Sequence, residues 1–477
     1  MSRRRPLRRR TVPRKWRTRL APRLEQQKPK GRAGVWLRIR RTVLSWWIWA
    51  LIAIVSTVLD RWWWAASTGL WAFVCFLLTP SERAPQYGLD HGFAVDDPQF
   101  LPTISGLTGA AVTGGNAVVL YNNGDEFYPA KLDAIGRAER SITIEGYIYW
   151  AGEIGLEFAR ALAQRAQSGV VVKILLDAVG SATIGSEILE IFERGGCQLA
   201  WYNPVRWYSI GRFNHRTHRK SLIIDGRIGF TGGAGIADHW KGNAQDPDHW
   251  REIHARIEGP CVVPLQTGFA DNWVQATREL IAGEVFFPEV RPAGQLQAIT
   301  IMSSPEAGAS NVRTMHYLSI AAARTSLFIA NPYFVPDATA TAQLIEAKRR
   351  GVDVRIMTSG RHNDNRVARL NSTRLLGPLL RAGIEILEYN RTMLHQKTMC
   401  VDRLWATIGT TNFDSRSFAH NEENNVCVYD RVFAQRLHDI FLDDARVCDR
   451  VTLESWQRRG LGHRSLELAA SFLEEQA

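Results

Sequence analysis

The sequence has little cysteine: six residues in 477, far apart, with no CxxC pair and no Cys/His cluster. This spacing excludes a zinc ribbon and a redox pair, and it indicates free thiols in a reducing compartment. The chain also lacks a P-loop and a GxGxxG segment, so no motif in it calls for a nucleotide. With 45% hydrophobic and 22% charged residues, it can form one large or two ordinary core-containing domains.

Acidic residues are nearly absent from the first 42 positions, where 17 Lys and Arg accompany a single acid, Glu25. The rest of the chain holds 42 of the 59 basic and 46 of the 47 acidic side chains, so the body is not basic. We predict that residues 1–42 form a disordered cationic tail, because the prolines are scattered and no helical apolar period is sustained. Anionic lipid, nucleic acid or no partner are the alternatives for this tail.

Long apolar runs occur in one region, where Val43–Leu59 and Trp62–Thr79 are uncharged and Asp60-Arg61 separates them. Each run is near the lower limit for crossing a hydrocarbon core of about 30 Å. One continuous helix would be too long for a single span. We therefore predict a transmembrane helical hairpin over 43–79, with tryptophans at the interfacial turn. A pair of buried core helices and a cleaved signal peptide are the alternatives.

The basic residues before the hairpin place the amino terminus in the cytoplasm by the positive-inside rule. Two spans return the body to the cytoplasm, whereas a single span or a re-entrant pair would change its side. The sequence thus predicts a multi-pass membrane protein with a cytoplasmic body. Anionic lipid is the favoured partner of the tail, since an anionic leaflet attracts basic residues close to its surface.

The body, from about Asn116, alternates short β-rich runs with helical stretches, as α/β folds do. It also repeats itself: both halves contain an HxKxxxxD motif, followed after six residues by a glycine-containing turn. One such motif is expected by chance roughly 0.01 times in a chain of this composition, so coincidence does not explain two. Two tandem copies of one α/β unit are predicted. The matching segments are Ser141–Tyr149 with Ser326–Phe334, Gly169–Asp177 with Gly351–Ser359, and His218–Gly233 with His395–Asn412.

The motif residues have the chemistry of a phosphate site. In an extended HxK segment, residues i and i+2 project from one face, so imidazole and ammonium point into the same space. Lys220 and Lys397 supply cations for phosphoryl oxygens, and His218 and His395 can act as nucleophile or proton carrier. If the halves face each other, one phosphodiester meets two histidines, which suits a two-step displacement. The lysines provide the charge that Mg²⁺ would otherwise supply, so neither a metal nor another cofactor is required.

The paired motifs occur together with NPYFVPD, WREIHARIEGP, FTGGAGIAD and GTTNFDSRSFAHNEE. Over residues 116–458 this combination resembles the phospholipase D superfamily, and within it the bacterial cardiolipin synthase family. The resemblance implies two tandem phospholipase D-like α/β sandwich repeats that face each other around a shared active site, preceded by the transmembrane hairpin. It also implies a phosphohistidine intermediate, with His218 as nucleophile and His395 as acid and base.

The resemblance further implies an acidic residue after each motif that orients the histidine of that motif. Glu252 and Glu423 occupy these positions and would accept the Nδ1 proton, as a carboxylate does in hydrolase triads. Surface carboxylates are the alternative for both residues. Asp225 and Asp402, which close the two motifs, are expected to hold the motif strands and lysines in place.

Four residues are expected to bind the substrate phosphate. Thr410 and Asn412 match the family's small-hydroxyl and asparagine positions, where the side chains hydrogen-bond the phosphate. Gly233 and Gly235 stand at the same places in the first half. Glycine is usual at the first of these, but Gly235 replaces an asparagine that the family generally has. Backbone N–H groups of a glycine-rich turn could still bind an oxyanion.

The implied activity is transfer of a phosphatidyl group between two phosphatidylglycerol molecules in the bacterial cell membrane, which gives cardiolipin and glycerol. Water as acceptor, or phosphatidylethanolamine as donor, would make a hydrolase or a different synthase from the same site. A nuclease would need a basic groove that the body lacks, and a non-catalytic membrane scaffold is the remaining alternative. Oligomeric state is not predicted. The expected divisions are 1–42 (tail), 43–79 (hairpin), 80–115 (linker), 116–290 and 291–458 (repeats), and 459–477 (carboxy-terminal helix).

Overall fold

The computed structural model describes residues 43, 45–78, 92–204, 214–304 and 310–473. The chain divides into two compact units, Met1–Asp90 and His91–Ala477. The predicted tail, 1–42, lies outside the described residues.

The amino-terminal unit is a helical hairpin of α3 (Trp46–Val58) and α4 (Trp62–Leu78), which pack against each other. The turn falls where the sequence predicts it: Asp60 adopts a φ of 54° between the two helices. Trp63, at the start of α4, is 90% exposed. Within the described part of the chain, no helix combines the length and the apolar character that crossing a membrane requires.

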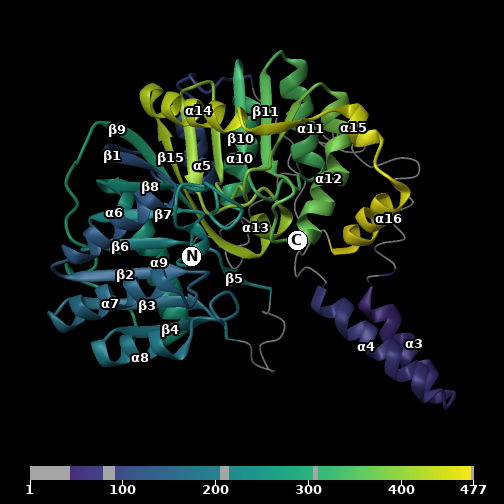
Figure 1. Ribbon diagram of the computed structural model, residues 1–477, viewed down its shortest axis with the longest axis horizontal. Coiled ribbons are helices and arrows are strands. Elements are labelled where there is room, and N and C mark those ends of the chain that lie inside the picture. The colour runs from purple at the N-terminus through teal and green to yellow at the C-terminus, as the bar shows by residue number, and fades with distance from the viewer. Residues whose placement is uncertain (1–42, 44, 79–91, 205–213, 305–309, 474–477) are drawn as a thin grey trace, which may run out of the picture. The chain divides into compact units, whose positions relative to one another are not determined.

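The larger unit is built on one mixed sheet, whose described strands run in the order β16-β12-β11-β10-β13-β14-β15-β9-β1-β8-β7-β6-β2-β3-β4 (Figure 1). The first eight strands are β1 (Thr113–Asn122), β2 (Ser141–Gly146), β3 (Val171–Asp177), β4 (Gln198–Tyr202), β5 (Arg216–Thr217), β6 (Ser221–Ile224), β7 (Ile228–Gly232) and β8 (Ile253–Glu258). The others are β9 (Leu296–Ser303), β10 (Ser326–Ala330), β11 (Asp353–Ser359), β12 (Glu385–Tyr389), β13 (Thr398–Val401), β14 (Trp405–Gly409), β15 (Asn421–Tyr429) and β16 (Cys448–Val451).

Helices cover both faces of this sheet (Figure 1). They are α5 (Phe100–Thr108), α6 (Gly124–Gly136), α7 (Glu153–Gln167), α8 (Ser186–Gly195), α9 (Val263–Thr277), α10 (Asn311–Ala322), α11 (Ala338–Arg349), α12 (Arg366–Arg381), α13 (Ser415–Ala419), α14 (Arg431–Ala445), α15 (Leu453–Gln457) and α16 (Leu461–Ala470). Short 3₁₀ turns occupy Asp238–Trp240, Pro260–Val262 and Ser471–Leu473. Helix α16 lies within the predicted carboxy-terminal helix.

Strand β3 shows how the sequence fills both faces. Its side chains alternate: Ile174 and Leu176 join one buried cluster with Phe158 of α7, whereas Leu175 joins another with Phe269 of α9. A strand that is apolar on both sides is typical of a central strand between two helical layers. The arrangement is therefore a three-layer α/β/α unit.

The order of the strands has an internal two-fold pattern. Strands β2-β3-β4 are parallel neighbours in the first half, and β10-β11-β12 are their counterparts in the second. The halves meet at β1 and β9, which pair antiparallel with Thr113 opposite Ala298. The second cluster extends across this junction, from Phe269 of α9 to Phe433 of α14. The predicted tandem repeats are confirmed, and they are joined edge to edge into one sheet.

Candidate active site

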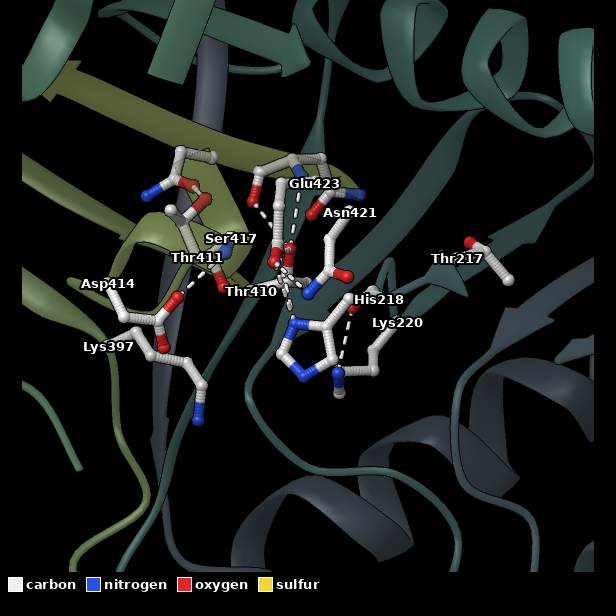
Figure 2. Close-up of polar contacts among 12 residues, drawn as sticks. Thr217, His218, Lys220, Lys397, Thr410, Thr411, Asp414, Ser417, Asn421 and Glu423 are labelled. Carbon is white, nitrogen blue, oxygen red and sulfur yellow. Dashed lines mark hydrogen bonds and ion pairs between the residues drawn. The ribbon is translucent and has the colours of Figure 1, made fainter. Parts of the chain in front are cut away.

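The two HxK segments lie just before equivalent strands. His218 and Lys220 precede β6, and His395 and Lys397 precede β13. All four side chains are buried, with 2 to 9% of their surface exposed. Figure 2 shows Lys397 of the second repeat reaching towards the His218 ring of the first. The structure thus brings the two predicted motifs to one place.

His218 is paired with a carboxylate from the other repeat. Its Nδ1 donates to Glu423 on β15, with distances of 2.9 and 3.1 Å to the two carboxylate oxygens. Since Glu423 is fully buried, the pair lies away from bulk water. This bond fixes the tautomer, so the Nε2 lone pair of His218 is left for reaction.

His395 is paired in the reciprocal way. Its Nδ1 donates to Glu252, which directly precedes β8 of the first repeat, at 2.8 Å. The expectation that each carboxylate orients the histidine of its own repeat is therefore wrong, although both carboxylates do meet an Nδ1 atom. Each histidine is oriented by the opposite half of the chain.

The crossing follows from strand pairing between distant segments. Strand β5, which leads into the first motif, pairs in parallel with the start of β15, and the His218 N–H donates to the Glu422 carbonyl at 2.9 Å. In the second motif the His395 N–H donates to the Arg251 carbonyl at 2.8 Å. Each motif segment thus runs beside the carboxylate segment of the other repeat.

A second layer of buried ion pairs supports this contact. Arg219, between His218 and Lys220, pairs with Glu422, the residue before Glu423. On the other side Arg251, the residue before Glu252, pairs with Asp444 of the second repeat at 2.8 Å. The Gln396 amide also donates to Asp444, at 3.0 Å.

These second-layer residues were not predicted from the sequence. The signal available for four of them was their position next to the motif residues, in HRK, HQK, NEE and WRE, whereas Asp444 lies on α14, away from these segments. Breaking a buried ion pair costs about 3–5 kcal/mol, so we regard these residues as positioning groups.

The lysines bind the backbone of their own motifs. Lys220 Nζ donates to the His218 carbonyl at 2.7 Å, and Lys397 Nζ donates to the His395 carbonyl. Burial lowers the pKa of Lys397 to about 8, although the carboxylates of Glu252 and Glu423 oppose this shift. Burial also lowers the pKa of Lys220 well below its ordinary value. An anion between the two ammonium groups would favour their charged forms.

The two histidines are neutral at pH 7. Burial lowers the pKa of His218 to about 4, although Glu423 opposes this shift. The pKa of His395 is lowered well below its ordinary range by burial and by the nearby Lys397 and Lys220.

The pKa values of the two carboxylates are shifted in opposite directions. Burial raises the pKa of Glu252. Burial would also raise the pKa of Glu423, but His218 and Lys220 outweigh it and hold that pKa below its ordinary value. The two dyads are therefore not equivalent.

Asp225 and Asp402, named with the motif residues, hold strands and do not touch the histidines or lysines. Asp225 accepts from the backbone N–H of Arg140 and Ser141 at 2.7 and 2.9 Å, where β2 begins. Asp402 caps β10 in the same way, through Ser326 N–H at 2.8 Å. The expected role in holding strands is observed, whereas the expected contact with the lysines is not.

Thr410 is expected to bind the phosphate, but in the structure it binds the Glu423 carboxylate. Its hydroxyl donates to Glu423, and the side chain is fully buried. Asn412 is different, because its side chain is 6% exposed and the Oδ1 atom has no hydrogen-bond partner. Only Asn412 of these two has a free polar atom in the structure.

The two glycines are close-packed. A Cβ atom at Gly233 would collide with the Glu252 carboxylate, so glycine lets this acid reach His395. A Cβ atom at Gly235 would lie 2.6 Å from the Ile148 carbonyl oxygen. Since the 235 position has no room for a side chain, packing accounts for the absence of the expected asparagine.

Aromatic rings that the sequence did not single out flank both histidines. The Tyr147 ring lies 5.4 Å from His218, and Lys220 lies 5.5 Å from the same ring. Trp240 and Trp250 of the first repeat lie 5.2 and 5.4 Å from the His395 ring. Within the described ranges, no group of three His, Cys, Asp or Glu side chains is placed to hold a metal ion.

Known proteins match this part of the chain. Residues 132–248 and 318–445 match the family described as "Cardiolipin synthase, PLD-like domain". The chain is 32% identical to a cardiolipin synthase of Listeria innocua over 368 residues, 76% of each protein. It is 32% identical to a cardiolipin synthase of Clostridium perfringens over 355 residues, 73% of this chain and 74% of the relative. The solved phosphatidylserine synthase of Haemophilus influenzae shares the fold, with a TM-score of 0.61 and 13% identity over 79% of this chain and 99% of that one.

Proposed function

The chain belongs to the cardiolipin synthase family of phospholipase D-like proteins, and from this premise we propose how it works. It transfers a phosphatidyl group from one phosphatidylglycerol to a hydroxyl of another, through a covalent intermediate on His218. The observation that carries the proposal is the pair of crossed His–Glu dyads, each with the lysine of its motif hydrogen-bonded to the histidine carbonyl.

In the first step, His218 Nε2 attacks the phosphorus of the donor lipid. A P–N bond forms, the P–O bond to glycerol breaks, and His395 gives its proton to the departing oxygen. Lys220 and Lys397 stabilise the charge that develops on the phosphoryl oxygens. The anionic phosphodiester also offsets the two ammonium charges, so it raises the pKa of His395 and lets it arrive protonated.

In the second step, a hydroxyl of the acceptor phosphatidylglycerol attacks the same phosphorus. His395, now neutral, takes the hydroxyl proton as the O–P bond forms and the P–N bond to His218 breaks. The sum is two phosphatidylglycerol molecules converted to one cardiolipin and one glycerol, with both histidines returned to their starting states.

The assignment of His218 as nucleophile rests on the difference between the dyads. The positive charge that develops on a phosphorylated imidazole is best stabilised by an ionised carboxylate. Glu423, whose pKa is held below its ordinary value, provides this beside His218. Glu252, whose pKa is raised by burial, suits the histidine that gains and loses a proton in each cycle.

The hairpin would hold the catalytic unit at its lipid substrates. The exposed tryptophans Trp62, Trp63 and Trp64 (64, 90 and 65% exposed) support insertion of this unit into the bacterial cell membrane, because indole rings favour the interface. The basic residues 1–42 then lie on the cytoplasmic side, as does the body. Extraction of bacterial membranes with alkaline carbonate tests this: full-length protein stays with the membrane, and release of the protein would contradict the proposal.

Lipid mass spectrometry tests the activity. Wild type and His218→Ala are incubated with phosphatidylglycerol vesicles, with and without phosphatidylethanolamine. Cardiolipin and an equal amount of glycerol are expected from wild type alone, without a need for phosphatidylethanolamine. Phosphatidic acid in place of cardiolipin would identify a hydrolase, and identical lipids in both samples would overturn the proposal.

A further inference from the structure

Arg313, on α10 of the second repeat, is a buried cation. The residue is 1% exposed, and its Nε and Nη2 atoms have no hydrogen-bond partner. No ion pair between residues in the described ranges includes it, and its guanidinium lies 5.5 Å from the Phe418 ring. A buried charge of this kind is costly unless a counter-ion joins it, so the position suits an anionic ligand.

Other groups beside Arg313 favour an anion. His420, two residues after Phe418, stacks on His215 at a ring distance of 6.2 Å. Burial, together with the charges of Arg416 and Arg313, lowers the pKa of His420 to about 4. The buried Ser417 hydroxyl has no partner and can donate a hydrogen bond. Arg313 thus faces α13 through Phe418, and the same short helix carries Arg416 and the Ser417 hydroxyl.

This cluster lies next to the start of the strand pair that leads to the first catalytic dyad. In the parallel pairing of β5 with β15, Asn421 is opposite Arg216. His215 and His420 come just before that pair, and His218 and Glu423 come three residues further along each segment. Three residues of extended chain span about 10 Å. The distance along the chain from the cluster to the first dyad is therefore short enough for one lipid head group to approach both.

We propose that Arg313, with Arg416, binds the phosphodiester of the acceptor phosphatidylglycerol while its free hydroxyl attacks the phosphorus carried by His218. This inference rests on the proposed function and specifies its acceptor. An anionic alcohol is held in place by two cations, whereas water and neutral alcohols gain nothing from them. The subsite therefore selects synthesis of cardiolipin over hydrolysis or transfer to glycerol.

The test gives the enzyme two acceptors in one vessel. Full-length protein is incubated with phosphatidylglycerol vesicles and isotopically labelled glycerol, and the ratio of cardiolipin to labelled phosphatidylglycerol is measured by mass spectrometry. Arg313→Met is expected to lower this ratio at least tenfold, and Arg313→Lys, which keeps the charge, less than threefold. Arg350→Met is the matched control, because its guanidinium donates to the Ala321 and Ala323 carbonyls at the far end of α10. It is expected to keep the wild-type ratio.

Each other outcome decides against the inference. A wild-type ratio in Arg313→Met overturns it, and so does an equal loss of both products in a variant whose thermal unfolding is unchanged. If Arg313→Met does not fold, Arg416→Gln, a half-buried position, is expected to lower the ratio at least threefold, and an unchanged ratio overturns the inference. If wild type makes cardiolipin and the ratio is unchanged in all variants, the subsite is refuted and the proposed function stands. A wild type that makes no cardiolipin overturns the proposed function as well.

Discussion

Glu423, in the second repeat, accepts a hydrogen bond from Nδ1 of His218 in the first repeat at 2.9 Å. Glu252 returns the same contact to His395 at 2.8 Å. Neither repeat therefore contains a complete dyad, and the geometry of each histidine depends on the docking of the two halves. The buried ion pairs Arg219–Glu422 and Arg251–Asp444 cross the same boundary, so they hold that docking in place.

The crossed pairing is tested by NMR on protein labelled with ¹⁵N-histidine. A hydrogen-bonded Nδ1 proton gives a downfield resonance, which the His218→Ala and His395→Ala variants assign. Glu423→Gln is expected to shift the His218 signal and leave that of His395, and Glu252→Gln to do the reverse. The opposite pattern would show pairing within each repeat.

The second prediction concerns alkaline pH. Lys397 is charged below its pKa of about 8, so its attraction for the phosphodiester is present below pH 8 and lost above it. We expect kcat/KM for cardiolipin formation to fall above about pH 8, since this constant reports the free enzyme. In Lys397→Arg the cation persists, because arginine does not deprotonate in this range. If kcat/KM falls at the same alkaline pH in this variant as in wild type, Lys397 is not the group that causes the fall.

Thr410 provides a third prediction, because its hydroxyl binds Glu423. A hydrogen bond to a charged group contributes about 1.5–3 kcal/mol, so Thr410→Val is expected to lower kcat/KM roughly 10- to 100-fold. Thr410→Ser keeps the hydroxyl and is expected to stay near wild type. Wild-type kinetics in the valine variant would mean that Glu423 needs no such support.

The fourth prediction concerns Gly235, where the family generally has asparagine. Since a Cβ atom would lie 2.6 Å from the Ile148 carbonyl oxygen, Gly235→Asn is expected to destabilise the fold by about 1–3 kcal/mol and lower Tm. Gly106→Ala, on α5 with no atom within 4 Å of the added Cβ, is the control and is expected to keep or raise Tm. A higher Tm or a gain of activity in Gly235→Asn would refute the packing explanation.

The sequence predicted what depends on local spacing and repetition. The HxKxxxxD motifs identified His218, His395 and both lysines, and matching strand segments identified the two α/β repeats. The predicted histidine partner of each carboxylate was wrong. The pairing depends on contact between β5 and β15, which lie some 200 residues apart in the chain. The Thr410 hydroxyl was assigned to phosphate for the same reason: its contact with Glu423 exists only once β14 and β15 are paired. Close approach at Gly235 likewise cannot be seen in a sequence.

The covalent intermediate is the most direct test of the whole account. His395→Ala is incubated briefly with phosphatidylglycerol and quenched at mildly alkaline pH, at which a phosphohistidine bond is stable. The protein is then digested, and the peptides are analysed by mass spectrometry. His395→Ala slows both steps, because His395 protonates the departing glycerol and activates the acceptor. The adduct that does form is expected on the peptide that contains His218, and His218→Ala should show no adduct. An adduct on the His395 peptide of His218→Ala, or none in any variant that still makes cardiolipin, would contradict the assignment of His218 as nucleophile.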